Sequence, residues 1–174
     1  MTKTWLLERE QILGRPREEV FAFFEDATNL ERITPPFLRF RILTPPPIVM
    51  RRGTLIDYQI ALFGVPIRWR TRIDVYEPQA RFVDTQLQGP YRVWRHTHEF
   101  EDVSGGTRMV DRVEYAVGFG PAGDAARTLF VSKTLDRIFD YRAATIDALF
   151  QGPTGSKIER AADQRMKLSS PATS

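Results

Sequence analysis

Residues 91–117 read YRVWRHTHEFEDVSGGTRMVDRVEYAV and carry the clearest structural pattern of the chain. Apolar and polar residues alternate in each half, and a Ser-Gly-Gly sequence at residues 104–106 separates the halves. A period of two matches a strand with one buried and one solvated face, and Gly-rich turns join antiparallel neighbours. The stretch therefore predicts two paired strands of an antiparallel sheet.

The same period of two extends back to residue 37 and predicts a meander of six strands, each followed by turn residues. The expected strands are residues 37–43, 54–63, 66–76, 81–88, 91–101 and 107–117. In the third of them, Arg68, Arg70 and Arg72 share one face while Trp69 and Thr71 share the other. We therefore expect an arginine-rich, basic outer face and a mainly apolar inner face.

One more strand and two short helices are expected before the meander. The strand covers residues 4–13, and Pro16 opens the first helix. Thr28 and Glu31 have the spacing of a capping box for the second helix, which must end before Pro35 because the residue preceding a proline is pushed out of the helical region.

A long helix is expected after the meander, over residues 122–150, because apolar residues return there at spacings of three and four without proline. About 30 residues at 1.5 Å each would span on the order of 45 Å, enough to cross the sheet. One helix cannot cover both faces of seven strands, so the sheet should curve around it. The expected fold is α+β, with a ligand-binding domain over residues 1–150 and a polar tail over residues 151–174.

Composition excludes several classes of protein. The 174 residues suit one domain, and the absence of cysteine excludes disulfides, thiol catalysis and Cys-based metal sites. The net charge of +3 and the lack of a Gly-rich phosphate loop give no support for a nucleic-acid or nucleotide partner. Residues 1–13 are too polar for a signal peptide and no apolar run has the length of a membrane span, so a cytoplasmic location is expected.

The inner face of the 91–117 hairpin carries polar residues that a dry core would not select. His96 and His98 share a face with Trp94 and Phe100, and Asp111 lies on the inner face of the next strand. Asp111 should lie opposite or diagonal to one of the histidines. A buried carboxylate costs several kcal/mol unless it is paired, so we expect a His/Asp group within an apolar wall.

Three segments resemble a known superfamily: ATNLERITPPFLRFRI at 27–42, LQGPYRVWRHTHEFED at 87–102 and RMVDRVEYAV at 108–117. Together with the element order, they resemble the helix-grip superfamily of START lipid-transfer domains, plant-allergen-like binding proteins and bacterial polyketide cyclase/dehydrase-like proteins. The resemblance covers about residues 3–150. It implies a pocket between the long helix and the concave sheet for a hydrophobic ligand, and it supplies no catalytic motif.

The leading hypothesis is therefore a binding or carrier protein for a lipid, quinone or polyketide-like compound, without a cofactor. One alternative is a polyketide cyclase or dehydratase in which His96, His98 and Asp111 provide acid-base catalysis. A ligand-gated module that binds another protein is a third. The two histidines and Asp111 also form a set that could hold Fe or Zn, but a hydrogen-bonded buried network is the favoured interpretation and no metal is expected.

Twelve residues are predicted to contact the ligand. The strand residues are chosen by parity, meaning the alternation of side chains between the two faces of the sheet, and the helix residues by the apolar stripe. They are Tyr58, Trp69, Thr71, Asp84, Gln86, Trp94, His96, His98, Asp111, Tyr115, Ile138 and Arg142. Arg142 interrupts the apolar stripe of the long helix; it could meet an anionic ligand group, although reaching solvent or pairing with a carboxylate of the sheet is the favoured interpretation. The outer arginines could touch an anionic membrane surface transiently, with a solvated face as the default.

Overall fold

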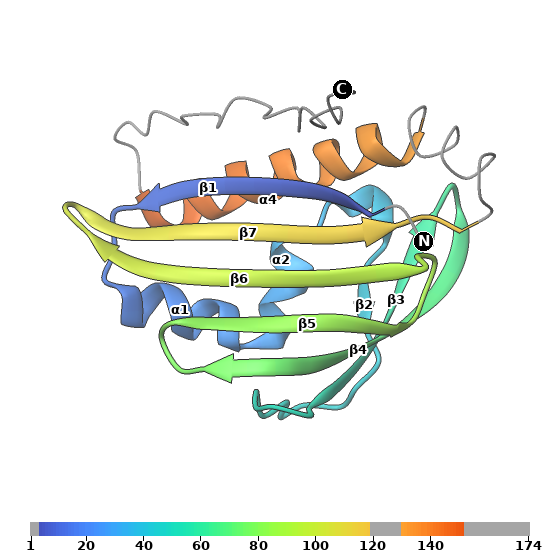
Figure 1. Cartoon of the computed structure of the whole chain (residues 1–174), viewed down its shortest axis with the longest axis horizontal. Coiled ribbons are helices and arrows are strands. Elements are labelled where there is room, and N and C mark those ends of the chain that lie inside the picture. Colours follow the sequence, from blue (N-terminus) through green and yellow to red (C-terminus); the bar gives the residue numbers. More distant parts are fainter. Residues whose placement is uncertain (1–3, 119–129, 152–174) are drawn as a thin grey trace, which may run out of the picture.

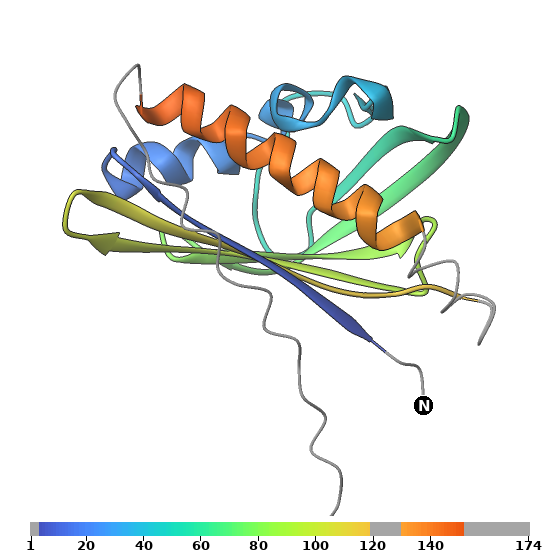
Figure 2. The same ribbon diagram turned by 90° about the horizontal axis from the view of Figure 1, so that it is seen from above.

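The computed structural model describes residues 4–118 and 130–151. They form one seven-stranded antiparallel sheet, in the order β1-β7-β6-β5-β4-β3-β2, with helices on one of its faces. Figure 2 shows α4 (Ser132–Gln151) lying across this face, with α1 (Arg17–Glu25) and α2 (Leu30–Ile33) on the same side. The strands are β1 (Trp5–Leu13), β2 (Arg41–Ile42), β3 (Leu55–Leu62), β4 (Val65–Glu77), β5 (Arg81–Gln88), β6 (Val93–Val103) and β7 (Gly106–Ala116). This confirms the expected helix-grip fold, and Figure 1 looks onto the outer face of the sheet, with the helices behind it.

The curvature of the sheet has a local cause in β4. The pairing of β4 with β5 shifts register between Arg70 and Thr71 and again between Ile73 and Val75. An extra residue in one strand bends it and increases its twist. In Figure 2 the β3–β4 end of the sheet accordingly rises beside α4 and α2, on the side where the helices lie.

The 91–117 hairpin forms as predicted, and its register is now fixed. His98 pairs with Asp111, and Trp94 pairs with Tyr115. The turn between the strands uses Gly105 and Gly106 at φ 92 and 145, a region of backbone conformation that favours glycine.

The expected strand over residues 37–43 is wrong for most of its length. Residues Pro36–Leu38 form a 3₁₀ turn, Arg39 follows in a left-handed conformation at φ 44, and only the two residues of β2 pair with β3. Consecutive prolines at 35 and 36 favour a turn over a ladder because they cannot donate hydrogen bonds.

The expected capping box is also wrong. The side chain of Asp26 accepts a hydrogen bond from the backbone N–H of Thr28 at 3.0 Å and caps the 3₁₀ turn Ala27–Asn29, which leads into α2. Glu31 instead accepts a hydrogen bond from the backbone N–H of Ile42, so it ties α2 to β2.

The long helix covers 20 residues as α4, or about 30 Å at 1.5 Å per residue. The part of the expected helix over residues 122–129, and residues 152–174 of the expected tail, lie outside the described residues, so the domain boundary near residue 150 stays a prediction. No helix within residues 4–118 and 130–151 combines the length and apolar character that crossing a membrane requires.

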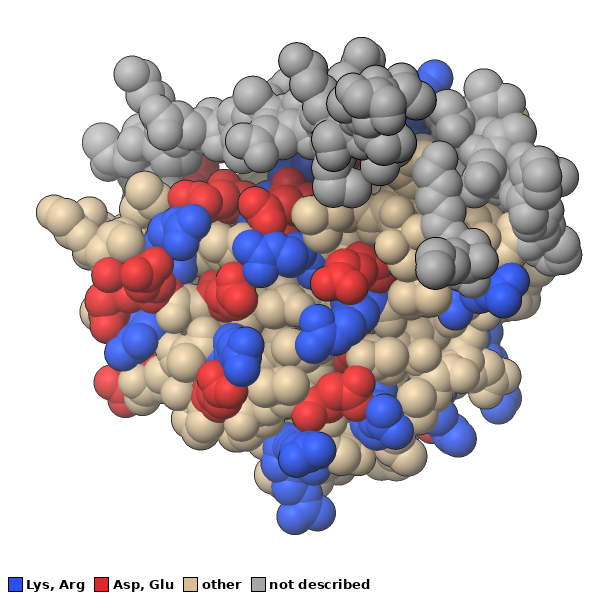
Figure 3. All heavy atoms as spheres, viewed as in Figure 1, with Lys and Arg blue, Asp and Glu red and all other residues tan. Residues whose placement is uncertain are grey.

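The outer face of the sheet differs from the basic surface that was expected. Figure 3 views this face and shows acidic side chains interspersed among the arginines. Arg70 pairs with Asp57 at 2.7 Å, and Arg112 pairs with Glu8 at 2.7 Å. The sequence pattern placed the arginines correctly, but it did not reveal that acidic partners on neighbouring strands lie beside them.

Candidate functional site

A cavity of about 140 Å³ lies between the sheet and the helices. Its walls come from α2, α4 and the inner face of β3 to β6, together with Phe24 of α1 and the loops before β3. Most lining residues are apolar or aromatic, and the ionisable ones other than tyrosine are Asp84, His96, His98 and Arg142. A concave apolar space with a few polar groups is the usual form of a small-molecule site.

Five aromatic side chains form one side of the cavity, which we call the aromatic wall: Phe40, Tyr58, Trp69, Tyr91 and Trp94. Each ring contacts another ring of the wall. The rings of Tyr58 and Trp69 stack with centroids 5.6 Å apart, and the Trp69 and Trp94 rings meet edge to face at 5.1 Å. Flat rings in such an arrangement offer large contact area at low conformational cost to a planar ligand.

The polar end of the cavity is a His/Asp cluster made of Asp84, His96, His98 and Asp111. Asp84 comes from β5, the two histidines from β6 and Asp111 from β7, so three adjacent strands bring the cluster together. The register shift of β4 between Ile73 and Val75 is a β-bulge, and it affects this cluster. Ile73, just before the bulge, pairs with Asp84, so the Asp84 side chain lies on the inner face like that of Ile73.

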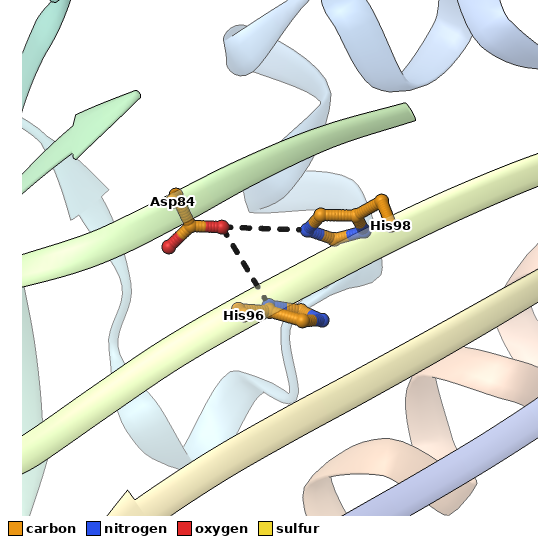
Figure 4. A group of neighbouring side chains, drawn as sticks. All are labelled: Asp84, His96 and His98. Atoms are coloured by element: carbon orange, nitrogen blue, oxygen red, sulfur yellow. Dashed lines mark ion pairs between the residues drawn. The ribbon is translucent and has the colours of Figure 1, made fainter. Parts of the chain in front are cut away.

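Each imidazole of the cluster lies between the two carboxylates. On the Asp84 side, Oδ2 is 3.4 Å from Nε2 of His98 and 3.8 Å from Nδ1 of His96. Dashed lines in Figure 4 mark these two pairs. On the Asp111 side, Oδ1 is 3.1 Å from Nε2 of His96 and 2.7 Å from Nδ1 of His98. The His96 contact is a hydrogen bond, whereas the His98 contact is short but lacks hydrogen-bond geometry, so we treat it as a charge contact.

Burial and neighbouring charges shift the pKa values of the two carboxylates in this cluster in opposite directions. Burial would raise the pKa of Asp111, but the charges of His98 and His96 and the hydrogen bond with His96 hold this pKa well below its usual range. The pKa of Asp84 is lowered in the same way, with burial opposing and His98 and His96 prevailing. Both carboxylates are therefore ionised near neutral pH.

The two histidines respond differently to the same surroundings. Burial and the charge of His98 lower the pKa of His96, and its contacts with Asp111 only partly offset this. For His98, burial also acts to lower the pKa, but the charge of Asp111 and the contacts with both carboxylates raise it above the ordinary value. The cluster thus holds a proton preferentially on His98, and such a pair can give or take a proton at a ligand beside it.

Three members of the cluster also have the donor types of a metal site. One ligand atom each from Asp84, His96 and His98 lie within 4.8 Å of one another, and Asp111 contacts the opposite nitrogen of both rings. Two histidines and a carboxylate suit Fe or Zn, and a carboxylate behind the histidines is the usual support for such ligands. The sequence pattern pointed to Asp111 as the carboxylate of this set, but the geometry favours Asp84.

Nine of the twelve predicted ligand-contacting residues line the cavity. They are Tyr58, Trp69, Thr71, Asp84, Trp94, His96, His98, Ile138 and Arg142. The hydroxyl of Thr71 donates a hydrogen bond to Oδ1 of Asp84 at 3.1 Å and so holds that carboxylate in place.

The other three predicted residues do not line the cavity. Asp111 lies behind the histidines, and Tyr115 is buried in the core beside Tyr91. Gln86 instead accepts a hydrogen bond from the backbone N–H of Tyr91 and donates one to its carbonyl oxygen. It spans the turn at Gly89 and Pro90, so its role is structural.

Tyr91 is the main cavity residue that the sequence pattern missed. By parity it belongs with Val93 and Arg95, which suggests an outward orientation, but β6 begins only at Val93. Tyr91 is part of the preceding turn and therefore escapes the alternation; its ring lies 4.7 Å from that of Trp94. The Gly-Pro turn before it was the available signal that parity does not apply there.

Known proteins share this fold. Residues 13–140 match the family described as polyketide cyclase / dehydrase and lipid transport. No curated protein matches the sequence significantly. Solved structures are similar in fold at low sequence identity.

Three of these structures illustrate the degree of structural similarity. TTHA0849 from Thermus thermophilus has a TM-score of 0.63 at 18% identity, covering 82% of this chain and 94% of that one. The Zhui aromatase/cyclase from Streptomyces sp. R1128 has a TM-score of 0.67 at 15% identity, covering 84% and 93%. Ara h 8.0201 has a TM-score of 0.57 at 17% identity, covering 83% and 98%. Since the family match extends over most of the sequence and the fold agrees with it, the chain belongs to the polyketide cyclase / dehydrase and lipid transport family.

Proposed function

We propose that this protein binds a hydrophobic small molecule in the cavity between the sheet and α4. The observation that carries the proposal is the cavity itself, with an aromatic wall on one side and a few charged groups elsewhere. A core selected only for stability would fill such a space, because interiors pack without voids of this size. Membership of a family described by lipid transport and polyketide chemistry supports the same conclusion.

The size of the cavity favours a compact ligand. One water needs about 10–15 Å³ of such cavity volume, so the space accommodates roughly ten waters. That suits a compact ligand of about two or three rings better than a long acyl chain. A polyketide-like or quinone-like ring system is therefore favoured over a membrane lipid.

A titration with the uncharged fluorescent probe N-phenyl-1-naphthylamine tests the proposal. We expect saturable fluorescence enhancement with one probe per chain. Ile138→Trp should reduce the affinity at least tenfold, because Ile138 lines the cavity and the indole would fill it. Leu6→Trp is the matched control, since Leu6 is 57% exposed on β1, and it should leave the titration unchanged. Equal binding by both variants would contradict an internal site.

A second candidate function is a cyclase or dehydratase, and the His/Asp cluster favours it. A histidine with a raised pKa beside one with a lowered pKa can act as acid and base on a β-keto compound in the same cavity. His96→Gln and His98→Gln should abolish turnover of a synthetic poly-β-keto thioester if the protein is an enzyme. If it is a carrier, both variants should keep the wild-type affinity for N-phenyl-1-naphthylamine. Unchanged turnover in folded variants would exclude these histidines as catalytic groups.

A further inference from the structure

Arg142 occupies a position on α4 that the helix otherwise reserves for apolar side chains. The buried residues of this helix are Leu135, Phe139, Arg142, Ile146 and Phe150, at spacings of three and four. These positions form one stripe that faces the sheet. Arg142 is only 8% exposed and lines the cavity.

The guanidinium of Arg142 has no anionic partner among the residues that the structure describes. Its contact is with an aromatic ring, since its central carbon lies 5.5 Å from the centroid of Phe139. Among the described residues, Asp84 has the one carboxylate that lines the cavity, and it is engaged by His96, His98 and Thr71. The expectation that Arg142 reaches solvent or pairs with a sheet carboxylate is therefore wrong.

A buried cation without a counter-charge is costly, and arginine cannot relieve the cost by losing its proton. The usual solution is a carboxylate or phosphate bound through the planar fork of the guanidinium. The pKa of Tyr58, in the aromatic wall, is affected by the charges of Asp84 and Arg142. Burial and the charge of Asp84 raise the pKa of Tyr58, while the charge of Arg142 lowers it.

We propose that the ligand is a compact aromatic or polycyclic carboxylic acid whose carboxylate binds Arg142 and whose ring packs on the aromatic wall. The inference rests on the proposed function and narrows it to an anionic ligand class. The two carboxylates of the His/Asp cluster would repel a ligand carboxylate, which leaves Arg142 as the anion subsite. The cavity volume of about 140 Å³ suits a ring system of about two or three rings.

Isothermal titration calorimetry with 2-naphthoate and its uncharged analogue 2-naphthamide tests this proposal. The two probes share a ring and nearly the same shape, and they differ in charge. We expect the wild-type protein to bind 2-naphthoate at least tenfold more tightly than 2-naphthamide. Arg142→Gln should remove this difference and keep the affinity for 2-naphthamide, whereas Arg142→Lys should retain part of it.

Arg137→Gln is the matched control. Arg137 lies on the same helix but is exposed, with its guanidinium 4.5 Å from the ring centroid of Phe37. This substitution should leave the preference for 2-naphthoate unchanged. If it reduces the preference as much as Arg142→Gln does, the effect is general electrostatics and the proposal fails.

The outcomes separate this proposal from the broader one. Equal binding of both probes by the wild-type protein would overturn the anion subsite while leaving the hydrophobic cavity in place. Binding of N-phenyl-1-naphthylamine without binding of 2-naphthoate or 2-naphthamide would also overturn the anion subsite and leave the hydrophobic cavity in place. Failure of all three probes would overturn the proposed function as well. Should Arg142→Gln not fold, the wild-type comparison of the two naphthalene probes still decides.

Discussion

Asp111 is the residue on which the His/Asp cluster depends most, because one oxygen of its carboxylate contacts both imidazoles. Removing one partner of a buried ionic group leaves the other uncompensated and costs about 3–5 kcal/mol. We therefore expect Asp111→Asn to lower the free energy of unfolding by about that amount. It should also lower the pKa of His98, since the charge of Asp111 is what raises it. Urea denaturation and an NMR titration of the histidine ring protons measure the two effects.

Asp102→Asn provides the comparison for that measurement. Asp102 also lies on the β6–β7 hairpin, but its side chain is 64% exposed where it pairs with Arg17. Exposed ion pairs contribute about 0–1 kcal/mol, so this change should be small. A similar loss in both variants would mean that the buried cluster contributes no more than a surface pair.

The opposite pKa shifts of His96 and His98 predict a maximum of stability near pH 6.5, the ordinary histidine pKa. Above that pH the unfolded chain releases a proton that His98 retains when folded, so the stability from His98 is lost as the pH rises through its folded pKa. Below it the unfolded chain binds a proton that folded His96 rejects, so stability also falls. Urea denaturation between about pH 5 and 8.5, a range that spans the ordinary histidine pKa, measures the curve.

Single substitutions separate the two sides of this maximum. His98→Gln should remove the decline above about pH 6.5, and His96→Gln should remove the decline below it. A wild-type curve that rises or falls monotonically across the range would show that the two histidines do not titrate in opposite directions.

Helix α4 stabilises the fold through its buried stripe, and substitution of Ile146 tests this role. Ile146 is fully buried in a core cluster with Phe82 and Phe100 that also includes α1 residues, whereas Leu149 on the same helix is 39% exposed. Large-to-small changes in a packed core cost about 2–5 kcal/mol. Ile146→Ala should lower the free energy of unfolding by that amount, and Leu149→Ala by less than about 1 kcal/mol. Equal losses would place the packing face of α4 elsewhere.

The elements that sequence reasoning recovered are those with long, regular patterns. The strand over residues 81–88 was predicted with the bounds that β5 has, and the 91–117 hairpin was correct to within two residues at each end. Errors fall where local turn chemistry competes with a short pattern, as at Pro35 and Pro36. There the alternation of Leu38, Phe40 and Ile42 suggested a longer strand than the two residues of β2.

The residues of the candidate site were predictable only where a regular strand alternates its side chains between the two faces of the sheet. The inward orientation of His96 and His98 follows from a regular strand, and their proximity to Asp111 follows from the hairpin. Asp84 was ambiguous because Val83 and Leu87 suggested the opposite parity, and the bulge in β4 that fixes its neighbours has no plain sequence signal. The isolation of Arg142 from every sheet carboxylate of the described part depends on tertiary positions that no local pattern contains.

The whole molecule separates its charges by face. Arginines and carboxylates pair across the outer surface of the sheet (Figure 3). Among the described residues, the inner face holds an apolar cavity that is lined by part of the His/Asp cluster and by the guanidinium of Arg142. The charge pairs on the outside offset one another in part, so that face carries mixed charge. The cavity is therefore the feature most suited to recognising a partner molecule.

A ligand inside the cavity should raise the thermal stability of the entire chain, because it binds the folded state and not the unfolded one. At a free concentration of about 100 times the Kd, N-phenyl-1-naphthylamine should add about 2.7 kcal/mol. For a chain of 174 residues that corresponds to a Tm increase of roughly 5–10 °C. Ile138→Trp should abolish the increase and Leu6→Trp should keep it, as calorimetric scans at matched probe concentrations would show. An increase that survives Ile138→Trp would place the probe outside this cavity and would contradict an internal site between the sheet and α4.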